Sequence, residues 1–145
     1  MKPENETPNT PLSGIVWTDA LEAQRTQTEH DAIAMRIAAV HRARLTAMSQ
    51  NGSTRLRLPP KSVTSGFAVG DWVLVDPQDR TVLRRLERSS LLQRKTAGSD
   101  VPQLIAANVD TLFIVTSCND DFNPARLERY LALANEAGTT PLIVL

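Results

Sequence analysis

Arginine and lysine side chains, which bind phosphate groups, gather in the middle of this 145-residue chain. Residues 32–95 carry twelve basic and four acidic side chains, whereas residues 1–31 and 96–145 each carry two basic and six acidic ones. The formal net charge of zero therefore conceals a basic segment between two acidic ones. One basic surface can hold a phosphate backbone whatever the charge of the whole chain. Residues 32–95 are thus the candidate surface for binding a polyanion.

The candidate polyanion-binding residues fall into two groups. The sheet group lies in predicted strands and the turns beside them, and it consists of Arg42, Arg44, Arg55, Arg57, Lys61 and Arg80. The junction group extends across the junction between the two predicted domains, and it consists of Arg84, Arg85, Arg88, Arg94 and Lys95. A basic run in the second position is equally typical of a linker that docks on both of its neighbours.

Only two aromatic residues, Phe67 and Trp72, accompany these basic side chains. Proteins that bind single-stranded nucleic acid stack bases on several aromatic rings. Trp72 suits a packed core or a barrel rim as well as it suits stacking. The composition therefore favours contacts with the phosphates and the shape of a structured RNA. The solvated face of a protein-interaction barrel is the alternative.

No set of side chains has the spacing of a catalytic site. The sequence contains no G-x-x-x-x-G-K-[ST] loop to hold phosphates and no D-x-x-G motif. Asp120 and Asp121 form a carboxylate pair, but they precede a predicted helix, where acidic side chains favour the N-terminus. His41 has no Ser, Cys or carboxylate near it in the sequence. We expect no catalytic and no nucleotide-binding residue in this chain.

The single cysteine, Cys118, excludes an internal disulfide, and with only His30 and His41 beside it no zinc site can be completed. Cys118 follows a predicted buried strand, so we expect a small apolar side chain without a redox role. The chain has no secretory leader and no apolar run of about 18 residues. We therefore expect a cytoplasmic protein without a membrane partner and without a metal in this chain.

Short alternating patterns separated by turn residues predict five strands, over residues 33–39, 43–49, 53–58, 71–76 and 81–86. Asn51-Gly52, between the second and third of these, is a strong hairpin signal. In the third strand, Leu56 and Leu58 lie on one face while Arg55 and Arg57 lie on the other. Five short strands in this length predict a Greek-key barrel of the OB type, which binds oligonucleotides on its second and third strands.

The region before the barrel divides into two parts. Residues 1–13 combine prolines and carboxylates without an apolar face, which predicts a disordered tail. Residues 14–31 predict an extension with a short helix after Thr18, and we expect Trp17 to pack on the barrel. The OB-fold domain then covers residues 32–88, and an inter-domain linker covers residues 89–109.

Residues 110–145 predict a βαβ unit. Apolar runs at 112–115 and 142–145 flank a helical pattern that starts at the N-cap Asn123 and Pro124 and ends at Gly138. The unbroken run at 112–115 indicates a strand buried on both faces of a parallel sheet. Because the sequence stops after the second strand, we expect this part to be labile or to self-associate artefactually through an uncovered edge.

Several segments, in order, resemble one family. They are W-T at Trp17, A-V-H-R at 39–42, V-G-D-W-V at 69–73, S-L-L-Q-R-K at 90–95, A-N-V-D at 107–110 and R-Y-L at 129–131. Over roughly residues 13–145 the chain resembles the circularly permuted, ribosome-associated GTPases known as RsgA, YjeQ or EngC. That family has an OB-fold, a GTPase domain with permuted motifs and a carboxyl-terminal zinc-binding region. The resemblance implies that residues 110–145 begin the GTPase domain and that its guanine motif would follow Leu145.

The resemblance also implies what the longer protein does. It would be a ribosome biogenesis GTPase that binds GTP and Mg²⁺, with Zn²⁺ held in a region outside this chain. Its partners would be the small ribosomal subunit and the ribosomal RNA of that subunit, in late maturation of the 30S particle. This chain would keep the RNA-binding module and lack GTPase activity. The alternative is a non-catalytic OB-fold module that binds nucleic acid or protein.

Overall fold

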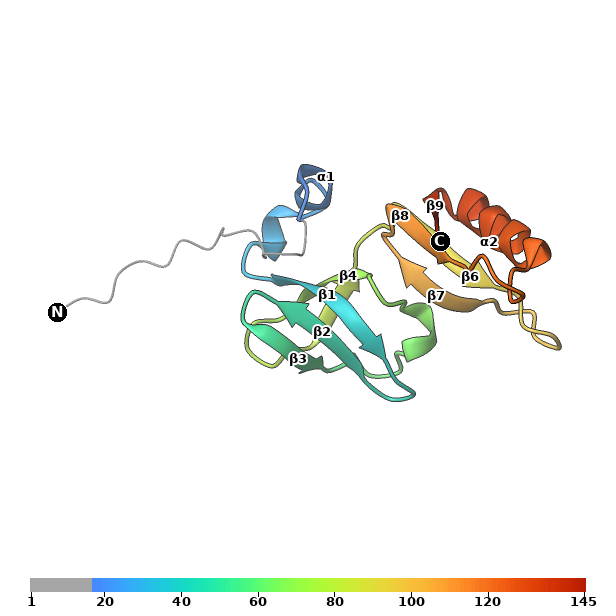
Figure 1. Ribbon diagram of the computed structural model, residues 1–145. Helices are drawn as coiled ribbons and strands as arrows, with labels where there is room; N and C mark the ends of the chain where they lie inside the picture. The colour runs from blue at the N-terminus through green and yellow to red at the C-terminus, as the bar shows by residue number, and fades with distance from the viewer. Residues whose placement is uncertain (1–16) are drawn as a thin grey trace.

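The structure, a computed structural model, describes residues 17–145 (Figure 1). The tail predicted for residues 1–13 lies outside the described residues. Three sheets follow one another along the described chain: a five-stranded sheet, a two-stranded antiparallel hairpin and a two-stranded parallel sheet. The five-stranded sheet lies at one end of the molecule, and the parallel sheet with its helix lies at the other (Figure 1).

The first sheet consists of β1 (Ile33–Val40), β2 (Leu45–Ser49), β3 (Gly52–Leu56), β4 (Trp72–Val75) and β5 (Val82–Arg85). All five strands predicted in this segment are present, and they pair antiparallel in the order β3-β2-β1-β4-β5. The Asn-Gly signal marks the β2–β3 hairpin, in which Ser49 lies opposite Gly52. Gly52 has a φ of 100°, a conformation that glycine adopts without steric cost.

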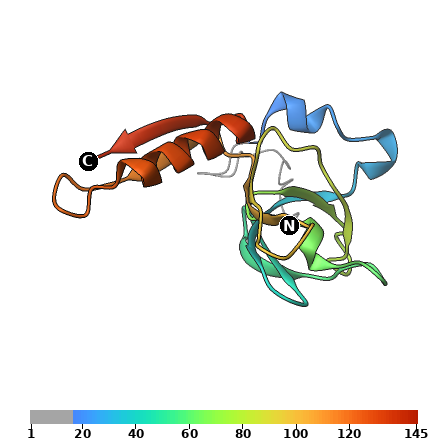
Figure 2. The same cartoon turned by 90° about the vertical axis from the view of Figure 1, so that its right-hand side faces the viewer.

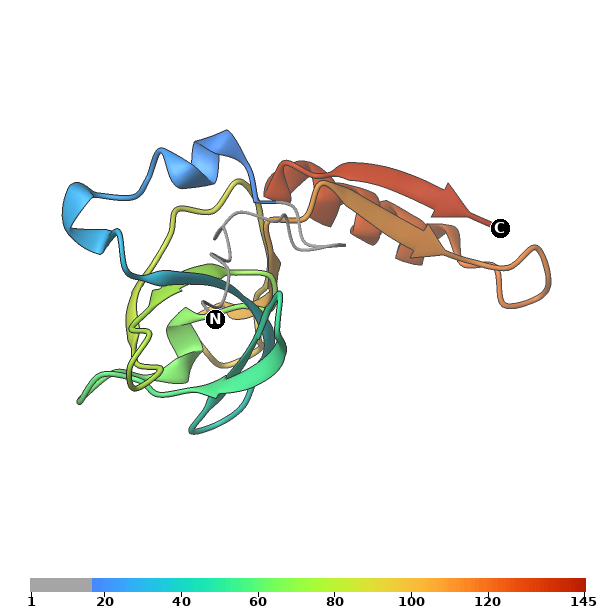
Figure 3. The same ribbon diagram turned by 90° about the vertical axis from the view of Figure 1, so that its left-hand side faces the viewer.

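The two outer strands of this sheet meet at one end. Just beyond β3, Arg57 forms a parallel bridge with Thr81. The amide of Arg57 donates to the carbonyl oxygen of Arg80, and its own carbonyl oxygen accepts from the amide of Val82, both at 2.9 Å. The sheet is therefore strongly curved around its inner face (Figure 3). A short 3₁₀ turn, η2 (Thr64–Gly66), lies between β3 and β4.

The inner face of the sheet holds the larger core. Met35 and Ile37 of β1, Leu45 of β2, and Val73 and Val75 of β4 are all fully buried there. Each set follows the two-residue period of a strand, so alternate side chains enter the core. Burial of large aliphatic side chains in this pattern supplies the main driving force for the sheet.

The outer face of β4 is buried as well, because the segment before β1 covers it. This segment contains α1 (Asp19–Glu22) and the 3₁₀ turn η1 (Gln27–Glu29). Leu21 and Ala32 pack there against Trp72 and Leu74. Figure 3 shows the segment lying across one side of the sheet. All four residues of β4 are buried for this reason.

The predicted packing of Trp17 and the predicted short helix are both present. The hydroxyl of Thr18 caps α1 by accepting from the amide of Leu21 at 3.3 Å. The ring of Trp17 packs edge-to-face on the ring of Trp72, with centroids 5.0 Å apart. The guanidinium of Arg25 lies 5.5 Å from the centre of the Trp17 ring. This aromatic pair fixes the segment to the sheet.

The second sheet occupies the interval 89–109, which the sequence predicts as a linker. Here β6 (Leu91–Arg94) and β7 (Gln103–Ala107) form an antiparallel hairpin. The sequence analysis predicts no strands in this interval, because strands of four and five residues without an apolar alternation leave little signal in the sequence. The hairpin is stabilised instead by tertiary contacts with the first sheet.

The third sheet is the predicted βαβ unit. Its strands β8 (Thr111–Val115) and β9 (Thr140–Val144) are parallel, and α2 (Pro124–Ala137) connects them. The side chain of Asn123 caps α2 by accepting from the amide of Arg126 at 3.0 Å. Gly138 ends the helix with a φ of 71°, so the local signals that predict this helix are confirmed.

The expectation that β8 is buried on both faces is wrong for the described residues. Ile114 is buried on the side of α2, whereas Phe113 is 63% and Val115 is 74% exposed. The helix covers only one face of the two-stranded sheet (Figure 2), so the side chains of the other face meet solvent. None of the helices in residues 17–145 is long and apolar enough to cross a membrane.

Candidate nucleic-acid interface

The sheet group is exposed and concentrated around β2, β3 and the loops next to them. Arg42 and Arg44 lie in the β1–β2 loop, where the amide of His41 donates to the carbonyl oxygen of Arg44 at 2.9 Å. Arg55 lies on β3 opposite Thr46 of β2, and Arg57 follows β3 directly. The strand period turns Leu56 into the core and leaves the two neighbouring arginines exposed.

Lys61 and Arg80 occupy turn positions with unusual backbone geometry. Both residues have a φ of 66°, in the left-handed region that non-glycine residues visit at some cost. Arg80 lies beside Arg57, whose amide bonds its carbonyl oxygen. Both side chains are exposed. The turns therefore place two further cations next to β3 and β5.

One carboxylate lies among these cations. The pKa of Asp79 is lowered from its ordinary value of 3.8, mainly because the side chain and the backbone amide of Thr81 donate hydrogen bonds to it. The amide of Thr81 lies 2.9 Å from Oδ1 of Asp79. The positive charge of Arg57 adds a smaller effect in the same direction. A phosphate backbone that binds at Arg57 must therefore avoid a negative charge on the β4–β5 turn.

A shallow hollow lies next to the β1–β2 loop. Arg42 and Ala43 form one side of it, and the segment that includes Pro59 and Val63 forms the other. The hydroxyl of Thr64 donates to the carbonyl oxygen of Arg42 at 3.1 Å, which ties the two sides together. The basic loop is therefore held in place over the hollow rather than projecting freely.

The junction group is divided by the structure. Arg84 donates from Nε and Nη2 to the two carboxylate oxygens of Glu29, at 2.7 and 2.9 Å, and from Nη2 to the carbonyl oxygen of Gln24 at 2.6 Å. The two bonds from Arg84 to Glu29, together with that of the Thr26 amide, lower the pKa of Glu29 from 4.5 to about 2, with the Arg84 side chain as the largest cause. Arg84 therefore holds the amino-terminal segment against β5.

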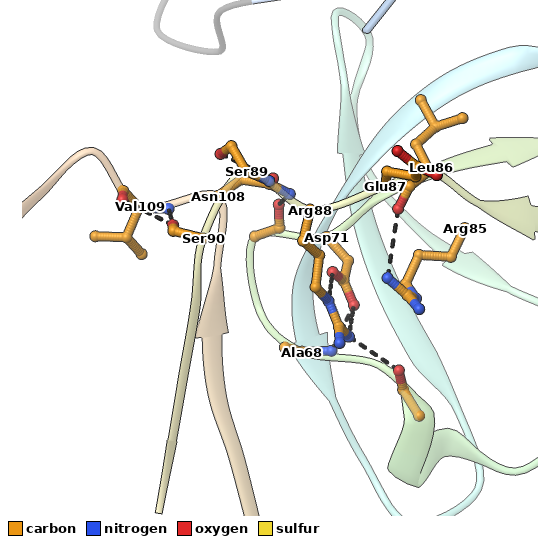
Figure 4. Close-up of polar contacts among 12 residues, drawn as sticks. Ala68, Asp71, Arg85, Leu86, Glu87, Arg88, Ser89, Ser90, Asn108 and Val109 are labelled. Carbon is orange, nitrogen blue, oxygen red and sulfur yellow. Dashed lines mark hydrogen bonds and ion pairs between the residues drawn. The ribbon is translucent and has the colours of Figure 1, made fainter. Parts of the chain in front are cut away.

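Arg88 is held in the same way (Figure 4). Its Nε and Nη2 donate to the two oxygens of the fully buried carboxylate of Asp71, each at 2.7 Å. Its Nη2 also donates to the carbonyl oxygen of Gly66 at 3.0 Å. Two members of the junction group are thus engaged in ion pairs within the chain, which makes them less available to a polyanion.

The other three members of the junction group are exposed. Arg85 makes only a long hydrogen bond of 3.4 Å to the carbonyl oxygen of Leu86 (Figure 4). Arg94 donates to the side chain of Gln103 at 2.8 Å across the hairpin. Lys95 lies in the β6–β7 loop. These three side chains are thus exposed on elements other than β2 and β3.

The remaining candidate residues do not form a site. Trp72 is 2% exposed and packs against Trp17, so it offers no surface for stacking a base. Cys118 is exposed in the loop beyond β8. His41, Asp120 and Asp121 are exposed as well. Among residues 17–145, no group of three or more His, Cys, Asp or Glu side chains could hold a metal ion.

Known proteins are similar to this chain in sequence. Residues 85–145 match the family model described as RsgA GTPase. A small ribosomal subunit biogenesis GTPase RsgA from Mesorhizobium japonicum is 57% identical over 134 residues, which cover 92% of this chain and 39% of that protein. The chain belongs to the RsgA family. A second family member, RsgA 2 of Vibrio parahaemolyticus, is 44% identical over 137 residues, which cover 93% of this chain and 37% of that protein.

Two solved structures share the fold of this chain. The circularly permuted GTPase YloQ aligns with a TM-score of 0.52 at 19% identity, over 82% of this chain and 42% of that one. YjeQ from Thermotoga maritima aligns with a TM-score of 0.54 at 18% identity, over 77% and 40% of the two chains. The present chain spans about two fifths of the length of the curated RsgA relatives described above.

Sequence reasoning missed the partners of Arg84 and Arg88. Glu29 is 55 residues away from Arg84, and Asp71 is 17 residues away from Arg88. Nothing in the local sequence distinguishes a paired arginine from a free one. A signal was present only for Asp71, a carboxylate at the start of a buried strand, because a charge there needs a partner.

Proposed function

We propose that this chain is the RNA-facing part of a GTPase that acts in maturation of the small ribosomal subunit. The observation that supports this best is the exposed sheet group around β2 and β3, in a chain that is 57% identical to a small ribosomal subunit biogenesis GTPase RsgA. In this proposal the arginines and Lys61 bind the phosphates of ribosomal RNA, and the shape of the RNA provides the fit.

The proposal includes an OB-fold barrel. The order β3-β2-β1-β4-β5 and the parallel bridge between Arg57 and Thr81 support it, because both are expected when a five-stranded sheet closes on itself. The amino-terminal segment covers the outer side of β4, where Trp72 is buried, and leaves Arg55 and Met48 exposed. The free outer surface of the sheet is therefore the surface that carries the basic side chains.

The cofactors belong to the longer relatives in this proposal. The described residues do not fit GTP, Mg²⁺ or Zn²⁺, since they contain neither a phosphate-binding glycine loop nor a cluster of metal-binding side chains. We propose that GTP and Mg²⁺ bind where the longer proteins continue the α/β part, and that this chain alone lacks GTPase activity. A cytoplasmic location, where ribosomal subunits mature, is part of the same proposal.

Binding of the chain to small-subunit ribosomal RNA tests the proposal. We expect the logarithm of the affinity to fall linearly with the logarithm of salt concentration between about 50 and 200 mM, as counterion release requires. The variant R42A/R44A/R55A/R57A should bind more weakly, and its slope should be smaller by about three if each arginine contacts one phosphate. A fluorescence anisotropy titration at four salt concentrations measures both quantities.

A matched control distinguishes the loss of residues that bind RNA from a general loss of positive charge. R126A/R129A removes two positive charges from α2, and R55A/R57A removes one from β3 and one from the residue directly after it. We expect the first pair to leave the slope unchanged and the second to reduce it. An unchanged slope in the quadruple variant would place the RNA on Arg85, Arg94 and Lys95. The absence of any salt-dependent binding would favour the alternative of a protein-interaction module.

A further inference from the structure

We infer that the β6–β7 hairpin and the five-stranded sheet form one rigid body, locked by a junction made of residues 68–71, 88–90 and 107–109. The inference goes beyond the proposed function, because it concerns how the basic sheet is connected to the α/β part and not what either of them binds. In this inference the predicted linker at residues 89–109 has a fixed position on the sheet, and the boundary between the two bodies lies after Val109.

Main-chain contacts form the first part of the lock. Val69 forms a parallel bridge with Ala106, and the amide of Ala107 donates to the carbonyl oxygen of Val69 at 2.8 Å. Gly70 has a φ of 92°, and a Cβ atom added to it would overlap the carbonyl oxygen of Ala107. The two backbones therefore approach more closely than any side chain would permit, and only glycine satisfies both conditions.

The buried ion pair forms the second part. The carboxylate of Asp71 receives both bonds from Arg88 and a further bond of 2.7 Å from the amide of Ala68. Asp71 lies directly before β4, and Arg88 lies three residues before β6 (Figure 4). A buried carboxylate without its partner is strongly unfavourable. The start of the hairpin is thus held at a fixed position on the sheet.

Asn108 forms the third part, at the end of the hairpin. Its amide nitrogen donates to the carbonyl oxygen of Gly70 at 3.0 Å, and its side-chain oxygen accepts from the amide of Ser89 at 2.9 Å. Arg36 of β1 donates to the carbonyl oxygens of Gly70 and Asn108 at 3.3 and 3.0 Å. One asparagine side chain therefore links both ends of the hairpin with the sheet.

Ser90 completes the lock and defines where it ends. Its hydroxyl donates to the carbonyl oxygen of Val109 at 2.8 Å and accepts from the amide of the same residue at 2.7 Å (Figure 4). At the next residue, the backbone carbonyl oxygen of Asp110 accepts instead from the amide of Thr140 in the parallel sheet at 2.9 Å. The hydrogen-bonding partners thus change from the first body to the second between Val109 and Asp110.

The α/β part packs against the hairpin. Helix α2 contacts β6, and a groove between them is lined by Gln93 and Pro102 on the hairpin side and by Leu133 and Glu136 on the helix side. A displacement of the five-stranded sheet therefore reaches α2 through the hairpin, without a flexible segment between them. Motion of the two bodies relative to each other has to occur at this groove and at Val109.

Amide hydrogen exchange on the whole chain tests the inference without RNA or nucleotide, so its outcome is independent of the proposed function. The amide of Ala107, corrected for its intrinsic rate, should exchange within about threefold of the amide of Val82 in the sheet, with the same dependence on denaturant. The amides of Thr116 and Thr140 in the α/β part should form a separate, faster class.

Two variants test the junction itself. Asn108 has a φ of 55°, so Asn108→Gly keeps the backbone conformation and removes only the side-chain bonds. We expect exchange at Ala107 to accelerate at least tenfold relative to Val82. Arg88→Met should have the same effect on exchange at Ala107. If Arg88→Met unfolds the chain, the result for Asn108→Gly decides the test. The control for the glycine variant is Lys61→Gly, and the control for the methionine variant is Arg85→Met. Both controls should leave the ratio of the exchange rates of Ala107 and Val82 unchanged.

Two results would overturn the inference. In the first, Ala107 exchanges together with Thr116 and Thr140 in the unmodified chain, which would make the hairpin part of the second body. In the second, Asn108→Gly leaves the ratio of Ala107 to Val82 unchanged, which would mean that the junction side chains do not hold the hairpin.

Discussion

The ring of Trp17 meets the ring of Trp72 at an interplanar angle of 73°, with centroids 5.0 Å apart. The first residue of the described chain therefore packs directly on the first residue of β4, 55 positions later in the sequence. This contact seals the outer core formed by Leu21, Leu74 and Leu86. A ring that is enclosed in this way stabilises the fold and takes no direct part in binding.

We expect Trp72→Ala to lower the free energy of unfolding by about 3–5 kcal/mol, because a fully buried indole is replaced by a cavity. Trp17→Ala should cost less, about 1–3 kcal/mol, since this side chain is only partly buried. Urea denaturation measures both values. Leu83→Ala, at a site 49% exposed on β5, is the control and should change stability by no more than about 0.5 kcal/mol. Equal costs at positions 17 and 72 would contradict the packing described.

A pair of glycine substitutions separates backbone strain from steric overlap. Gly52 and Gly70 both have positive φ, but only at Gly70 would a Cβ atom meet the backbone of Ala107. We expect Gly52→Ala to cost about 1–2 kcal/mol through strain alone. Gly70→Ala should cost at least about 2 kcal/mol more, because the Ala107 carbonyl has to move. Thermal and urea unfolding measure the difference, and equal effects would show that the junction tolerates a side chain.

The stability of the chain should depend on pH through Glu29. Its pKa in the folded chain is about 2, below its ordinary value of 4.5, because Arg84 bonds its charged form. The ion pair therefore stabilises the fold above pH 4.5, and this contribution is lost as the pH falls from 4.5 towards 2. At pH 6 the urea midpoint of the unmodified chain should exceed that of the Glu29→Gln variant. The difference between the two midpoints should be smaller at pH 3. A gap of constant size would mean that the Arg84 pair is not responsible.

Nucleotide binding by this chain alone should be absent. The phosphate-binding and guanine-binding motifs of GTPases do not occur in the 145 residues, so we expect no GTP affinity stronger than about 1 mM and no hydrolysis. Isothermal titration calorimetry with GTP in Mg²⁺ buffer measures the affinity. A micromolar dissociation constant that excess GDP reverses would disprove the expectation and would require a binding site of a different kind.

The uncovered face of the parallel sheet should drive self-association. Phe113 pairs with Leu142 and Val115 with Val144, so these four apolar side chains lie together on the face opposite α2. We expect a concentration-dependent dimer in sedimentation velocity, and we expect Leu142→Lys/Val144→Lys to abolish it. Leu83→Lys replaces an equally exposed leucine on β5 and should leave the dimer unchanged. A dimer that survives the double substitution would place the interface elsewhere.

Local signals in the sequence were sufficient for the elements that depend on them. Asn123, Pro124 and Gly138 each satisfy a requirement of one helix end, so the bounds of α2 follow from the sequence. Asn51-Gly52 defines the β2–β3 hairpin in the same way. The exposure of Arg55 on β3 and of Arg57 just after it follows from the two-residue period of a strand.

The hairpin at residues 89–109 and the pairing of two arginines could not be predicted in this way. β6 and β7 are stabilised by Gly70, Asp71 and Arg36, which lie far from them in the sequence. A count of charges likewise treats Arg84 and Arg85 as equals, although only Arg84 meets a carboxylate. Such features depend on tertiary contacts, which leave no periodic pattern in a single sequence.

The amino-terminal segment also decides where a domain can be cut. A shortened chain that starts at β1, the first strand, would keep all five strands of the sheet and would look complete on a topology diagram. It would nevertheless expose Trp72 and Leu74, and it would leave Arg84 without Glu29. We therefore expect a piece that starts at Trp17 to be more stable than one that starts at β1, although both contain the same five strands.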